Sequence, residues 1–217
     1  KSMSETRSKR KTQECKVFEL KIDYSSCNRK TKETLKMSFV EAKWLHNYYL
    51  SQNDIFNQDT KISKVTTLNK DKQPIEKELK YITSKHKQQI LKDIQTSIRS
   101  LAKKKSHFYK VGRLKYKSDY SSLDYNQFNN THFIKNNRIK LLGIKQHLRV
   151  HGLQQITDEY EIANLKLIKK ASGYYIKITC FRNQQHNRQT TNQVAGLDFG
   201  IKNNITTSDG EVFNCSN

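Results

Sequence analysis

The stretch from Cys15 to Tyr24 reads CKVFELKIDY and alternates along its length. Its large apolar residues occupy the even positions: Phe18, Leu20, Ile22 and Tyr24. In a strand, successive side chains point to opposite faces, so this period of two predicts a half-buried β-strand whose even-numbered face meets a core. Residues 1–14, directly before it, are polar and basic, and we expect them to be disordered.

Two helices are predicted after this strand. Apolar residues spaced three and four apart define the first: Leu35, Phe39, Ala42, Leu45 and Tyr49. Thr34 is the candidate cap at its start. The second runs from about Ser84 to Lys105, and its apolar stripe is expected to pack against the first helix: Ile90, Ile94, Ile98 and Leu101. Residues 51–80 are polar and contain the only proline, Pro74, so we expect a loop and a short helix there.

Short apolar runs broken by Gly and Asn fill residues 106–182 and favour strands in a small barrel or sandwich. The expected strands cover residues 114–117, 131–134, 138–142, 145–149, 164–170 and 174–181. Residues 183–193 are all polar, which is typical of a linker.

The charge of the chain indicates a polyanionic partner. Lys and Arg number 41 against 20 Asp and Glu, which gives a formal net charge of +21. A compositional bias toward Lys would raise the acidic residues equally, yet these are scarce. Nucleic acid is the expected partner, since basic side chains that neutralise phosphates release condensed counterions. Lys103, Lys104 and Lys105 end the second helix, where either a phosphate or the helix dipole would favour cations.

Several other classes fit poorly. No apolar run approaches the roughly 20 residues that span a bilayer, and no signal-peptide core begins the chain, so we expect no membrane partner. The four cysteines show no C-x-x-C spacing, which excludes a visible zinc ribbon or redox pair and favours a cytoplasmic protein with free thiols. The chain lacks a starting Met and ends on Cys215-Ser216-Asn217 with no stop signal, so we expect both ends to be cut.

The segment from Val194 to Phe213 reads VAGLDFGIKNNITTSDGEVF and predicts a new β-unit. Asp209-Gly210 is a hairpin turn signal between residues 205–208 and 211–213. A strand that carries an Asp, here Asp198, followed by Gly and a hairpin is how an RNase H-like nuclease begins. Such a carboxylate binds Mg²⁺ or Mn²⁺. The alternatives are an exposed Asp at a strand end and a kinase D-F-G loop, but no glycine-rich loop or H-R-D precedes the motif.

Six stretches in order resemble the TnpB family, the transposon-encoded relatives of type V CRISPR effectors. They are CKVFELKIDY (15–24), MSFVEAKWLHNYYL (37–50, with Trp44 and Asn47), RLKYKS (113–118), KLLGIK (140–145), Gly173-Tyr174-Tyr175 and the terminal segment with Asp198. The specificity of this resemblance lies in order and spacing over nearly the whole chain.

The resemblance implies an α+β fold. Residues 15–30 and 106–182 would form a wedge-type β-barrel, residues 31–105 an inserted helical recognition lobe, and residues 194–217 the first β-hairpin of an RNase H-like (RuvC) domain after the linker. The partners would be a guide RNA and target DNA, and the oligomeric state is left open. Asp198 would be the first catalytic carboxylate and a metal ligand. The candidate nucleic-acid contacts are the lysines at the end of the second helix and the cations of the 113–118 motif: Lys103, Lys104, Lys105, Arg113, Lys115 and Lys117.

Two departures from the family bear on function. The later Glu and Asp of the nuclease and the paired cysteines of its zinc ribbon are not in this stretch, so we expect no zinc here and no cutting by this stretch alone. The family's proline before the 113–118 motif is also missing. Trp44 and Tyr116 fit either base stacking or core packing. The competing functions are a nuclease-inactive RNA-guided repressor and a ribosomal or general RNA-binding protein.

Overall fold

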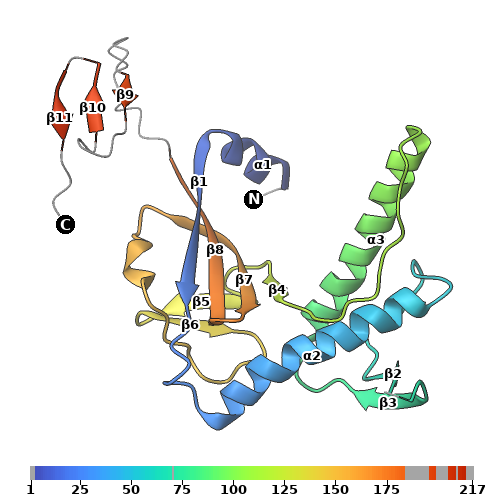
Figure 1. The fold of residues 1–217 in the computed structure, drawn as a ribbon. Coiled ribbons are helices and arrows are strands. Elements are labelled where there is room, and N and C mark those ends of the chain that lie inside the picture. Colours follow the sequence, from blue (N-terminus) through green and yellow to red (C-terminus); the bar gives the residue numbers. More distant parts are fainter. Residues whose placement is uncertain (1–2, 70, 184–195, 199–204, 209, 214–217) are drawn as a thin grey trace. The chain divides into compact units, whose positions relative to one another are not determined.

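The computed structural model describes residues 3–69, 71–183, 196–198, 205–208 and 210–213. The chain divides after Asn183 into two compact units. The fold is α+β, with helices and antiparallel sheets (Figure 1).

The main sheet of the first unit has four antiparallel strands in the order β1-β8-β7-β4. These are β1 (Gln13–Lys21), β8 (Gly173–Asn183), β7 (Glu161–Lys170) and β4 (Ser122–Tyr125). The alternation predicted for the first strand is confirmed for Phe18, Leu20 and Ile22, which are buried while their odd-numbered neighbours are not. For Tyr24 it is wrong, because β1 ends at Lys21 and this ring is 41% exposed. Phe18 and Leu20 pair with Ile178 and Ile176 of β8, which are buried on the same face.

Two long helices, α2 (Arg29–Ser51) and α3 (Ser84–Ser106), confirm the predicted helical segments. All five apolar residues predicted for the first helix are buried, and the two helices pack on each other (Figure 1). The predicted cap at Thr34 is wrong. Asn28 caps α2, because its side chain accepts a hydrogen bond from the Thr31 N–H at 2.8 Å, whereas the Thr34 hydroxyl donates to the Lys30 carbonyl inside the helix.

Residues 51–80 form a hairpin where the sequence predicted a loop and a short helix. Its antiparallel strands are β2 (Lys64–Leu68) and β3 (Pro74–Glu78). The β-branched run Val65-Thr66-Thr67 favours a strand, and the buried Val65 anchors it. Pro74 is the first residue of its strand. Proline has no N–H to donate, and a strand tolerates this at its first residue.

A second hairpin, β5 (His132–Lys135) and β6 (Arg138–Leu141), turns at Asn136-Asn137. Both turn residues have positive φ, 50° and 53°, which asparagine tolerates best after glycine. A short 3-10 helix, η1 (Leu153–Gln155), lies farther along the chain.

The described strands form no closed barrel. Residues 145–149, expected as a strand, contribute only the isolated bridge Ile139↔Leu148, and Val150 bridges Ile22 just beyond β1. Residues 114–117 are also not a strand. Three of their four side chains are exposed, so neither face of this stretch packs against the core as a half-buried strand would.

The basic head forms a helix, α1 (Met3–Lys11), over residues predicted to be disordered. Long-range contacts account for the difference. Arg10 lies over the ring of Phe181 at 3.7 Å, and Lys9 and Arg10 pair with Glu161 at 2.7 and 2.9 Å. A segment with little apolar surface of its own is thus ordered by partners from β7 and β8.

In the described residues of the second unit, short antiparallel strands pair in the order β11-β10-β9. They are β9 (Leu197–Asp198), β10 (Ile205–Thr207) and β11 (Val212–Phe213). The predicted hairpin is confirmed, and Gly210 in its turn has a φ of +83°, a value that favours glycine. The predicted linker lies outside the described residues except for Asn183, which ends β8.

No helix in the described residues is long and apolar enough to cross a bilayer. The described cysteines, Cys15, Cys27 and Cys180, are free thiols. Burial raises the pKa of the Cys180 thiol to about 11, so it is a packing residue rather than a nucleophile.

Candidate nucleic-acid interface

The predicted basic residues fall on one continuous stretch, residues 103–118, which we call the basic segment. Lys103, Lys104 and Lys105 form the last turn of α3, and Arg113, Lys115 and Lys117 lie in the irregular chain that follows. All six are classed as exposed. No Asp or Glu occurs between Asp93 and Asp119.

The side chains of the basic segment take part in no ion pair among the described residues. The carbonyls of the lysine triplet are already occupied, because the His107 and Phe108 N–H groups close the helix end on them. The ammonium groups of the lysine triplet thus have neither a helix-end carbonyl nor an acid as a described partner.

Three aromatic side chains of the same segment are also exposed. Phe108 is 99%, Tyr109 68% and Tyr116 64% exposed. Phe108 has a positive φ of 61°, an uncommon conformation for a bulky residue. Exposed aromatic surface interleaved with cations is typical of surfaces that bind single-stranded nucleic acid, because every base offers a face for stacking.

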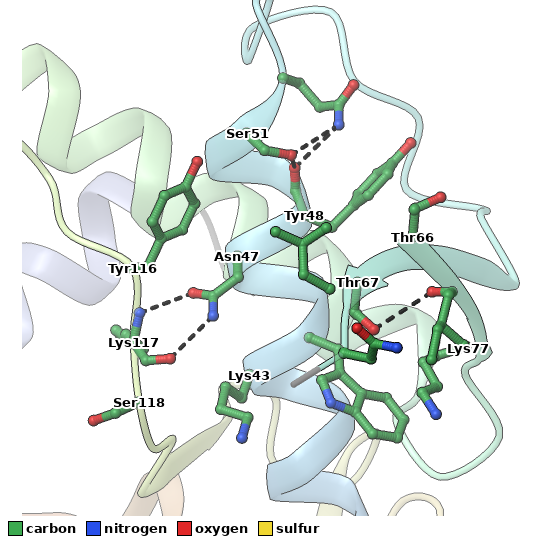
Figure 2. A pocket seen from close by; sticks show the side chains of 15 residues that line it. Lys43, Asn47, Tyr48, Ser51, Thr66, Thr67, Lys77, Tyr116, Lys117 and Ser118 are labelled. Carbon is green, nitrogen blue, oxygen red and sulfur yellow. Dashed lines mark hydrogen bonds between the residues drawn. The ribbon is translucent and has the colours of Figure 1, made fainter. Parts of the chain in front are cut away.

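Asn47 of α2 fastens the end of this segment (Figure 2). Its side chain accepts from the Lys117 N–H at 2.8 Å and donates to the Lys117 carbonyl at 3.0 Å. The Lys117 ammonium lies 4.2 Å from the centre of the Tyr120 ring. Partial burial lowers the pKa of Lys117, and Asp93 opposes that shift. One amide thus replaces the strand pairing that the sequence predicted for residues 114–117.

A groove of about 1050 Å³ opens between α2, the β2–β3 hairpin and residues 116–118, and we call it the α2 groove (Figure 2). Three aromatic residues, Trp44, Tyr48 and Tyr116, line it together with three lysines, Lys43, Lys77 and Lys117. None of its lining residues is acidic. Periodicity could not indicate this groove, because its walls come from three separate parts of the chain.

Glu41 holds the hairpin wall of the groove in place. This carboxylate is 1% exposed and accepts three backbone N–H hydrogen bonds, from Lys80 at 2.8 Å, Tyr81 at 2.7 Å and Ile82 at 3.0 Å. The chain that leaves β3 is thereby attached to α2. Sequence analysis missed this residue, since a lone Glu on the buried face of a helix has no local signal for its partner.

Asp198 lies on β9 in the second unit and pairs with Thr206 of β10. Its side chain is exposed, so its carboxylate oxygens, which are hard ligands suited to Mg²⁺ or Mn²⁺, are accessible. Gly200 lies outside the described residues. The structure describes no cluster of three or more metal-ligating side chains in the residues it covers, so metal binding at Asp198 stays a prediction.

Comparisons with known proteins assign no family to this chain. No protein-family model matches it, and no curated protein matches it. Its function is therefore inferred from the residues and surfaces described above.

Proposed function

We propose that this chain is the guide-RNA- and target-DNA-binding part of an RNA-guided DNA endonuclease of the TnpB type, and that it supplies the first catalytic Asp. The observation that carries the proposal is the basic segment, where cations without an ion-pair partner and exposed aromatic rings alternate along one stretch of chain.

Electrostatics supports a phosphate-rich partner. Lysines of β7 are neutralised, as in Lys166–Asp124 at 3.0 Å and Lys169–Asp119 at 2.6 Å. The described side chains of the basic segment form no such ion pair, so this stretch carries uncompensated positive charge. Phosphates that bind this surface would release counterions and supply sequence-independent affinity. In RNA-guided effectors the protein holds the heteroduplex in this way, and base pairing reads the sequence.

The chain order supports the TnpB-type architecture. The strand β1 pairs with β8 across more than 150 residues, and α2, β2, β3 and α3 lie between β1 and the rest of the main sheet. This is the order expected of a recognition lobe inserted into a wedge domain. The antiparallel order β11-β10-β9 is compatible with the start of an RNase H-like domain, and Asp198 lies on β9, the first of these strands along the chain.

Asp198 would hold a divalent metal ion in the complete nuclease, where that ion would activate the attacking water and stabilise the leaving oxygen. One carboxylate cannot hold two ions, so cleavage is assigned to the complete protein. The free thiols fit a reducing compartment, and we place the protein in the cytoplasm.

Binding of structured RNA tests the first part of the proposal. Affinity should fall about 100-fold or more across a few-fold rise in NaCl, because several phosphate contacts release counterions. Filter binding at a series of salt concentrations measures the slope. A flat response would contradict electrostatic binding by the basic segment.

Guided plasmid cleavage by the complete protein tests the second part. Asp198→Ala should abolish cleavage in Mg²⁺ while target binding and thermal stability stay nearly unchanged. Glu211→Ala, which removes another exposed carboxylate of the same unit, is the matched control and should cut normally. Residual cutting by a folded Asp198→Ala protein would remove Asp198 from the catalytic role. A wild-type protein that binds its guided target without cutting would favour the repressor.

A further inference from the structure

We propose that the α2 groove binds one unpaired nucleotide, with its base against the aromatic side chains and its phosphate beside the lysines. This inference rests on the proposed nucleic-acid binding and specifies the ligand of one surface. The groove includes the end of the basic segment, because Tyr116, Lys117 and Ser118 line it.

The rings of the groove are available to a ligand. Trp44 is half-buried, and no hydrogen bond in the described part of the chain occupies its indole N–H. Tyr116 is 64% exposed at the rim and reaches the groove because Asn47 holds the neighbouring Lys117 (Figure 2). Tyr48 lines the same space. An aromatic wall offers stacking to any base, whatever its sequence.

The charge of the groove suits a nucleotide rather than a neutral ring. Lys43, Lys77 and Lys117 are its charged lining residues, and no carboxylate lies among the residues that line it. The Lys77 ammonium lies 5.7 Å from the Trp44 ring centre, so a cation and an aromatic face adjoin. A base with its phosphate presents the complementary pair of groups, a flat π-surface and an anion.

Small polar side chains of the groove can meet the edge of a base. They belong to Ser51, Gln52, Thr66, Thr67 and Asn69. Hydroxyl and amide groups offer both donors and acceptors. The Ser51 and Thr67 hydroxyls and the Gln52 and Asn69 amide nitrogens donate to groups of the protein, so their oxygen atoms are the groups left to accept from a base. A base inside a duplex has both faces covered and its pairing edge engaged, so rings and amides in a pocket are useful only to an unpaired base.

The size and rigidity of the groove also fit. Its volume, about 1050 Å³, is comparable with the roughly 300–1,000 Å³ of pockets that hold drug-sized ligands. The Glu41 carboxylate fixes one wall and the Asn47 amide another. Walls that are already in place reduce the entropy lost when a ligand binds.

Trp44 makes the test specific, because it is the only tryptophan of the chain. Its emission should be quenched by a single-stranded DNA or RNA oligonucleotide and not by a blunt duplex of the same length, while fluorescence anisotropy of labelled strands shows that both bind. Quenching by either single strand supports the groove, and the two arms show which nucleic acid it takes.

Two variants refine this measurement. Tyr116→Ala should weaken single-strand binding by about 5- to 100-fold, the range expected for the loss of one stacked base, and leave duplex binding unchanged. Phe56→Ala is the matched control, because Phe56 is also exposed and aromatic but lies outside the groove. It should bind both ligands as the wild type does. Circular dichroism establishes that both variants are folded.

The outcomes separate the two proposals. If both nucleic acids bind but neither quenches Trp44, or the duplex quenches equally, the groove does not hold an unpaired base, and the proposed function stands. If the anisotropy shows no binding of any nucleic acid, the proposed function itself is wrong, and the groove inference is wrong with it.

Discussion

The aromatic residues of α2 and those of the basic segment occupy opposite environments. Phe39 and Tyr49 are 1% and 0% exposed, and Phe39 stacks on Tyr174 of β8 with ring centres 6.0 Å apart. Phe108 and Tyr116, in contrast, are 99% and 64% exposed. The same residue types therefore serve folding in one region and remain uncovered in the other. Apolar surface left in water without a folding role marks a surface for a partner.

Charged residues repeat this contrast. On β7 and β8, lysines pair with acids, as Lys177 does with Glu19 at 3.1 Å. In the basic segment no lysine forms an ion pair among the described residues, and Asp93 acts on Lys117 only from beyond ion-pair distance. Net charge alone therefore does not locate an interface, whereas a stretch of cations without ion-pair partners indicates one.

The largest expected effect is the loss of stability caused by removing a buried aromatic residue. Phe39→Ala should lower the free energy of unfolding by about 3–5 kcal/mol, since it removes a core ring and leaves a cavity. Phe108→Ala, its exposed counterpart, should change stability by no more than about 0.5 kcal/mol. Urea denaturation followed by circular dichroism measures both. Equal losses in the two variants would break the contrast and place Phe108 in a core.

Glu41 extends the comparison to polar groups. Glu41→Ala should destabilise the protein by about 3 kcal/mol, because three backbone N–H groups at residues 80–82 lose their charged acceptor. The matched control is Glu33→Ala on the same helix. Glu33 is exposed and accepts one hydrogen bond, from the Tyr81 hydroxyl, so its loss should amount to less than about 1 kcal/mol. Similar values for the two variants would show that Glu41 does not anchor the hairpin.

Stability should also depend on pH through a buried histidine. Burial lowers the pKa of His86 from 6.5 to about 4, so folding favours its neutral form. The resulting stabilisation is complete above pH 6.5 and is lost as pH falls from 6.5 toward 4. Its size is on the order of 3 kcal/mol, at about 1.4 kcal/mol for each unit of the pKa difference. His46 and His132 have pKa values lowered to about 4 as well and steepen the same trend.

His86→Gln isolates the contribution of one histidine. The variant should lose less unfolding free energy than the wild type between pH 7 and pH 4, measured by denaturation at each pH, since glutamine does not titrate. If the unfolding free energy of the variant falls with pH as steeply as that of the wild type, His86 does not change its protonation between the folded and unfolded states.

Local sequence pattern was a good guide wherever one face of an element decides its structure. The strand at Cys15–Tyr24, the buried faces of α2 and α3, and the hairpin around Gly210 follow from residue spacing and turn chemistry within a few residues. The types of residue in the basic segment were also evident, and Trp44, Asn47 and Tyr116 were indicated by the resemblance. Phe108 and Tyr109 were not singled out, although exposed aromatics amid lysines were a readable signal.

Tertiary structure decided the rest. α1 forms because Glu161 and Phe181 meet Lys9 and Arg10, and the irregular path near Lys117 is fixed by Asn47, 70 residues away. The α2 groove exists because a helix, a hairpin and a loop converge. A residue's own neighbours in the chain determine its periodicity and its turn, and these can be read from sequence. Burial of a carboxylate, neutralisation of a lysine and the closure of a pocket depend on partners brought from far along the chain, and these are settled only when the chain folds.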